Sequence, residues 1–114
     1  IVRTLKQHGY DVVDFGLPSA AISFTSGGGA YDIVVSDVVM PEMSGMAMVD
    51  RLAAFRPGLP TIYVSGYHDE ELRALIGDRP LLAKPFAGSD LVDLVRRRLD
   101  AAAANDLDAQ DSVA

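Results

Sequence analysis

Asp37, Ser65 and Lys84 stand at the ends of three apolar runs in the sequence. Each run is short, rich in valine, isoleucine or leucine, and nearly without polar residues, which is typical of strands buried on both faces of a parallel sheet. In open sheets of this kind, ligands bind outside the carboxyl ends of the strands. We therefore expect a carboxylate, a hydroxyl and an ammonium group, far apart in the sequence, to converge at one edge of a sheet.

These three groups together suit the chemistry of phosphoryl transfer. A carboxylate can attack a phosphoryl group and form an acyl phosphate, whose charge an ammonium group and a hydroxyl donor can stabilise. Phosphoryl transfer depends mainly on positioning and charge neutralisation, so Lys84, Ser65 and a divalent metal would suffice beside Asp37. Taken alone, Asp37 would be interpreted as a turn former, but partners at two other strand ends favour a function.

Apolar periodicity and turn residues predict the elements that must position these groups. Strands are expected at residues 10–15, 32–36, 61–65 and 81–83, and helices at 1–8, 17–24, 46–55, from 68 or 69 to 77, and from Ser89 onward. Helices and strands therefore alternate along the chain with short connections. That alternation predicts an α/β fold, a doubly wound parallel sheet with helices on both faces.

The 114-residue chain has the length of one domain, a net charge of −6 and no cysteine. Its composition predicts a domain over residues 1–103 and an acidic, flexible tail over residues 104–114. The negative charge argues against nucleic-acid binding by this segment, and no apolar run is long enough to span a membrane. The lack of cysteine excludes a disulfide scaffold and fits a cytoplasmic protein.

Three segments resemble, in order and spacing, the signature of response regulator receiver domains from two-component signalling. The first resembles the phosphoacceptor segment of that family, the second the strand end that carries its hydroxyl, and the third its Lys-Pro motif, whose peptide bond is commonly cis. These segments are Asp37–Gly45, Val64–Tyr67 and Leu82–Phe86, within a resemblance that covers about residues 1–100. The resemblance implies a flavodoxin-like sheet with the strand order 2-1-3-4-5.

The resemblance also implies a role for each residue of the site. Asp37 accepts the phosphoryl group, and it binds Mg²⁺ together with the backbone carbonyl of Val39. Ser65 donates a hydrogen bond to the phosphoryl group once that group is present, and Lys84 pairs with it and with Asp37. Pro85 fixes the turn that aims Lys84. The implied partner is a histidine kinase or a phosphotransfer protein.

Two features depart from the family pattern. Leu81 stands three residues before Lys84, where receivers usually carry an aromatic switch residue. The chain also starts within what should be the helix after the first strand, so we expect that central strand, and the acidic pair that helps to bind Mg²⁺, to be absent from it. Asp11 and Asp14 belong to the next predicted strand and are not assigned to that pair. An open slot in the sheet would favour strand exchange or a dimer.

Three functions are compatible with these residues. The first is a phosphorylatable signalling domain, not an enzyme, which stands alone or ends a larger sensor kinase. The second is a receiver-like interaction module that takes no phosphate because it lacks the acidic pair. The third, a small hydrolase with Asp37 as nucleophile, needs a second aspartate two positions further on, where Val39 stands, and we set it aside.

Overall fold

The computed structural model describes residues 1–66, 74, 77 and 79–113. The described strands form one parallel sheet in the order β1-β2-β3, in which Val34 pairs with Thr61 and Tyr63 pairs with Leu81. Their bounds are Val34–Asp37 for β1, Thr61–Ser65 for β2 and Leu81–Ala83 for β3. These are three of the predicted strands, and their parallel pairing confirms the predicted fold class.

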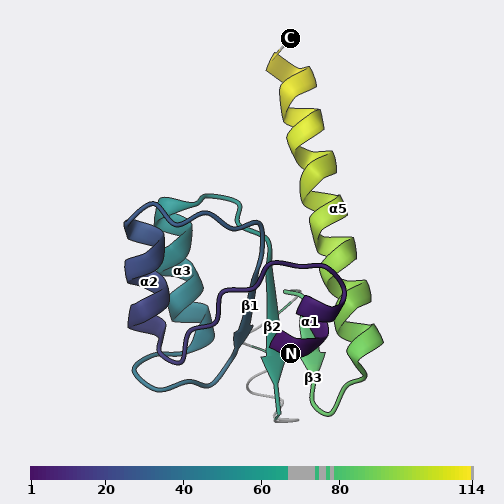
Figure 1. Ribbon diagram of the computed structural model, residues 1–114. Helices are drawn as coiled ribbons and strands as arrows, with labels where there is room; N and C mark the ends of the chain where they lie inside the picture. The colour runs from purple at the N-terminus through teal and green to yellow at the C-terminus, as the bar shows by residue number, and fades with distance from the viewer. Residues whose placement is uncertain (67–73, 75–76, 78, 114) are drawn as a thin grey trace.

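Helices cover both faces of the sheet (Figure 1). They are α1 (Val2–Gln7), α2 (Pro18–Ser26), α3 (Gly45–Phe55) and α5 (Gly88–Val113). Helices α2 and α3 pack side by side on one face, whereas α1 and α5 lie together on the other. The short helix expected between residues 68 and 77 falls mostly outside the described residues. Among the helices that are described, none is both long and apolar enough to cross a membrane.

The core is divided by the sheet, because successive side chains of β2 point to opposite faces. Ile62 is fully buried against Leu91 and Val95 of α5 and against Leu5 of α1. The next residue, Tyr63, packs on the other face with a cluster made by Val38, Met46, Val49 and Leu81. The strand that ends in Ser65 is therefore held by apolar contacts on both sides.

The strand predicted for Tyr10–Phe15 is absent, and that prediction is wrong. The alternation it rested on is real: Tyr10 and Val12 pack against the core, whereas Val13 is 61% exposed. A strand also requires a neighbour that accepts and donates its backbone hydrogen bonds. In the expected strand order this segment pairs only with the first strand of the sheet, and no strand among the described residues takes that place.

Helix α5 is longer than the sequence predicts. It continues to Val113, through residues that we expected to form a flexible acidic tail. The run Ala101–Ala104 favours continuation of the helix to residue 104, since alanine has the highest helix propensity, and no glycine or proline interrupts the chain beyond it. Figure 1 shows this end of α5 projecting away from the sheet.

Tyr63 places a phenol in the core, where it is only 3% exposed. Burial raises the pKa of this phenol above its ordinary value of 10.0; the charge of Arg79 acts against this shift, and that of Asp50 acts with it. The folded protein therefore favours the neutral phenol more strongly than the unfolded chain does.

The free energy of unfolding is expected to fall as the pH rises above 10.0, because the unfolded chain then releases the Tyr63 proton while the folded protein retains it. Urea unfolding measured between about pH 8 and pH 11 tests this. The variant Tyr63→Phe should lose less stability over the same interval. Equal losses in the two proteins would contradict the prediction.

Candidate functional site

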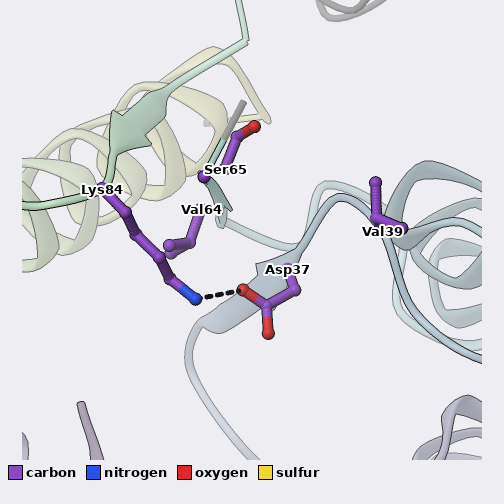
Figure 2. Close-up of a pocket in the computed structure, with 6 residues that line it drawn as sticks. Asp37, Val39, Val64, Ser65 and Lys84 are labelled. Carbon is purple, nitrogen blue, oxygen red and sulfur yellow. Dashed lines mark hydrogen bonds and ion pairs between the residues drawn. The ribbon is translucent and has the colours of Figure 1, made fainter. Parts of the chain in front are cut away.

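The carboxyl ends of the three strands meet at one open pocket. Asp37, Ser65 and Lys84 line it, together with Val39, Val64 and Gly66 (Figure 2). The three residues predicted to converge therefore line one pocket, and Val39 lines it as well. The sheet register explains this, because Asp37 lies beside Val64 and Ser65 lies beside Ala83 in adjacent strands.

Backbone hydrogen bonds continue the sheet past the last residue of each strand. The amide of Val38 donates to the carbonyl of Val64 at 3.0 Å, and the amide of Lys84 donates to the carbonyl of Ser65 at 2.7 Å. These bonds fix the chain directly after Asp37 and hold the start of Lys84 beside Ser65. The pocket is consequently built from strand ends and is not left to a long flexible loop.

Asp37 and Lys84 form an ion pair. The Lys84 Nζ atom lies 3.2 Å from Asp37 Oδ1, and the two side chains are 47% and 49% exposed, respectively. Water screens a pair this exposed, so its contribution to folding is small. Its chemical consequence is larger, because the ammonium group lies where charge would build up on a group attached to Asp37.

Ser65 comes from the strand between those of Asp37 and Lys84. The residue is 5% exposed, and Figure 2 shows its hydroxyl turned away from the Asp37–Lys84 pair in this view. A change of side-chain rotamer would be needed to aim it at a group on Asp37.

The Lys84–Pro85 peptide bond is cis, as the resemblance implied.

Gly45 approaches the backbone of Asp37 more closely than any side chain would permit. A Cβ atom added to Gly45 would lie 2.1 Å from the Asp37 carbonyl oxygen and 2.8 Å from Ser36 Oγ. Ser36 Oγ itself donates to that carbonyl at 2.9 Å. The start of α3 therefore presses against the residue that carries the carboxylate. Gly45 belonged to the predicted motif, but the sequence did not reveal this contact.

Asp37, whose carboxylate is an oxygen donor of the kind that Mg²⁺ prefers, lines the pocket, and so does Val39, whose carbonyl the resemblance assigns to the ion. Within the described residues, no group of three or more His, Cys, Asp or Glu side chains could hold a metal ion. Mg²⁺ often keeps several waters and binds one or two carboxylates together with phosphate oxygens. These donors therefore fit an ion shared with a phosphoryl group and water, and not a cage made by protein alone.

This fold and this arrangement of strand ends define a receiver domain. A sequence model of the response regulator receiver domain matches residues 1–96, and the chain belongs to that family. A crystal structure of a response regulator receiver protein from Sinorhizobium medicae WSM419 superimposes with a TM-score of 0.78 at 29% identity, over 88% of this chain and 82% of that one. The likeness confirms the expected flavodoxin-like fold.

Two characterised relatives are much longer than this chain. The chain is 38% identical over 103 residues to the sensor kinase CckA of Brucella abortus (strain 2308), which is 87% of this chain and 11% of that protein. It is 36% identical over 98 residues to the C4-dicarboxylate transport transcriptional regulatory protein DctD of Rhizobium meliloti (strain 1021), 83% of this chain and 21% of that protein. The chain therefore spans a small part of the length of either relative.

Proposed function

We propose that this domain accepts a phosphoryl group on Asp37 from a phosphorylated histidine of a histidine kinase or phosphotransfer protein. One observation carries the proposal: the Asp37 carboxylate lies 3.2 Å from the Lys84 ammonium group, in a pocket that Ser65 also lines. A nucleophile and a cation thus face each other in a solvent-accessible pocket, and a buried serine lies in its wall. That combination suits phosphoryl transfer, which depends on positioning and charge neutralisation.

In the proposed step, an oxygen of Asp37 attacks the phosphorus atom of the phosphohistidine. A P–O bond forms while the P–N bond breaks, and its electron pair leaves with the imidazole, which takes a proton from solvent. Lys84 stabilises the negative charge of the transferred group, and Ser65 rotates to donate a hydrogen bond to it. Mg²⁺ held by Asp37 and the Val39 carbonyl would neutralise further charge on the phosphoryl oxygens.

The proposed signal is a shift between two packings near the pocket. Ser65 lies at the end of β2, and β3 with Leu81 lies beside it in register. Movement of the Ser65 hydroxyl would therefore first change the packing of β3 and of the helices that flank it. Leu81, which packs beside Tyr63, would have to repack by a small displacement, since it has no ring to swing.

We propose the cytoplasm as the compartment, in keeping with a sequence free of cysteine.

A second candidate function is an interaction module that takes no phosphate. The composition of the pocket favours it: among the described residues, Asp37 is the one carboxylate that lines it. A single carboxylate binds Mg²⁺ weakly unless a phosphoryl group or further ligands join it. In this case the fold would bind its partner irrespective of phosphorylation.

Mass spectrometry of the natural protein, treated with a small phosphodonor with and without Mg²⁺, separates the two functions. We expect a gain of one phosphoryl group that depends on Mg²⁺, and loss of the adduct after mild alkali, which cleaves acyl phosphates. Absence of any adduct in the presence of Mg²⁺ would favour the interaction module.

A further inference from the structure

The loop over residues 38–44 joins β1 to α3 and carries Val39, whose carbonyl the proposed function assigns to Mg²⁺. Both ends of the loop are fixed: the Val38 amide donates to the Val64 carbonyl at 3.0 Å, and the Gly45 amide donates to the Val38 carbonyl at 2.8 Å. Between these anchors the loop faces solvent, and Val39 is 62% exposed. Contacts of the middle of the loop therefore decide where its backbone lies.

Glu42 ties the middle of this loop to α2. Its Oε1 atom accepts hydrogen bonds from Ser19 Oγ at 2.9 Å and from the Ser19 amide at 3.3 Å. Ser19 is the second residue of α2, a helix whose N-cap residue, Leu17, supplies no side-chain hydrogen bond and whose first turn contains no acidic residue. Glu42 thus acts as a cap from a distant part of the sequence, with its negative charge at the positive end of the helix dipole. Figure 1 shows the loop passing the start of α2.

The backbone of Glu42 is strained. Its φ angle is 70°, in the left-handed region that residues other than glycine rarely adopt. Glycine would take this conformation without the steric cost. Strained residues persist where contacts of the surrounding structure hold them, and they are concentrated near functional sites. At this position the Met43 amide donates to the Pro41 carbonyl at 2.8 Å and closes a three-residue turn around Glu42, while the pair of hydrogen bonds to Ser19 holds its side chain.

We propose that Glu42 is a positioning residue of the Asp37 site. Its carboxylate clamps the loop after β1 to the start of α2, and so holds the Val39 backbone in place beside the pocket. The inference rests on the proposed function, because the loop matters to chemistry only if Asp37 is phosphorylated. The clamp itself is a property of the unphosphorylated protein and is measurable without any phosphodonor.

The variant Glu42→Gly separates positioning from a merely structural role. It removes the clamp and also the strain, and because these two effects on stability oppose each other, its urea midpoint should stay close to that of the parent protein. Its rate of phosphoryl uptake should nevertheless fall by about threefold or more. The variant Glu42→Gln keeps an acceptor oxygen and should stay within about twofold of the parent rate. A parent rate in Glu42→Gly would overturn the proposal.

Two serines of α2 provide a matched pair for the other side of the clamp. Ser19→Ala removes the Oγ hydrogen bond to Glu42, whereas Ser26→Ala removes a comparable bond, to the Ser23 carbonyl, at the far end of the helix. Ser19→Ala should slow phosphoryl uptake and Ser26→Ala should not. In the Glu42→Gly background, Ser19→Ala should add nothing, because both changes remove one interaction.

Amide hydrogen exchange over residues 39–44 tests the clamp without phosphate. Exchange should be faster in Glu42→Gly and in Ser19→Ala than in the parent or in Ser26→Ala. Unchanged exchange in both variants would refute the clamp. Faster exchange, combined with a parent protein that takes up no phosphate, would uphold the clamp and refute the proposed phosphorylation alone.

Discussion

The variant Asp37→Asn is expected to abolish phosphoryl uptake while the domain remains folded. An amide is too weak a nucleophile to form the acyl phosphate, so no adduct should appear with any phosphodonor. Stability should change little. The ion pair with Lys84 joins side chains that are 47% and 49% exposed, and an exposed pair contributes at most about 1 kcal/mol. The amide oxygen of asparagine can still accept a hydrogen bond from Lys84.

Intact-mass measurement after phosphodonor treatment, together with urea unfolding, tests this expectation. Asp32→Asn is the matched control, since Asp32 is also exposed and lies before β1, at the opposite end of that strand. The control should gain one phosphoryl group as the parent does. An adduct of the same size on Asp37→Asn would show that another residue accepts the phosphate.

Gly45→Ala is expected to be the most disruptive small substitution near the site. In an ordinary helix the same change stabilises the protein, because alanine has the higher helix propensity. Here the added methyl group would lie 2.1 Å from the Asp37 carbonyl oxygen, which belongs to the backbone and cannot rotate away. Overpacking of this kind typically destabilises a protein by about 1–3 kcal/mol. Relief of the clash would move either α3 or Asp37, so phosphoryl uptake should slow as well.

The control for Gly45→Ala is Gly16→Ala, because a Cβ atom at Gly16 would meet nothing within 4 Å. Urea unfolding should place the control within about 0.5 kcal/mol of the parent protein. Equal stability of Gly45→Ala and Gly16→Ala would mean that the contact between α3 and Asp37 is not as tight as the structure indicates.

The elements nearest the site could be predicted because each is specified by its own residues. The apolar runs before Asp37 and Ser65 have the composition of buried parallel strands, and β1 and β2 form there. The convergence of Asp37, Ser65 and Lys84 followed from a general property of parallel sheets, whose strands end at a common edge. Neither inference needed knowledge of which side chains touch.

Contacts between distant segments could not be predicted in the same way. Nothing in the sequence links Glu42 to Ser19, because both are common surface residues and their bond depends on how α2 packs beside the loop. Gly45 likewise resembles an ordinary turn glycine until the Asp37 carbonyl is found against it.

The segment Tyr10–Phe15 shows most directly what could not be predicted from the sequence. Its alternating residues predict a strand, and the alternation does place Val12 on the core and Val13 in solvent. Strand formation, however, depends on hydrogen bonds to a neighbouring strand, which the segment's own residues cannot supply. The sequence by itself thus determined which residues line the pocket and which strands carry them. Only the tertiary structure decided which strands pair, which glycine position tolerates no side chain and which carboxylate clamps the loop, because these depend on segments brought together by folding.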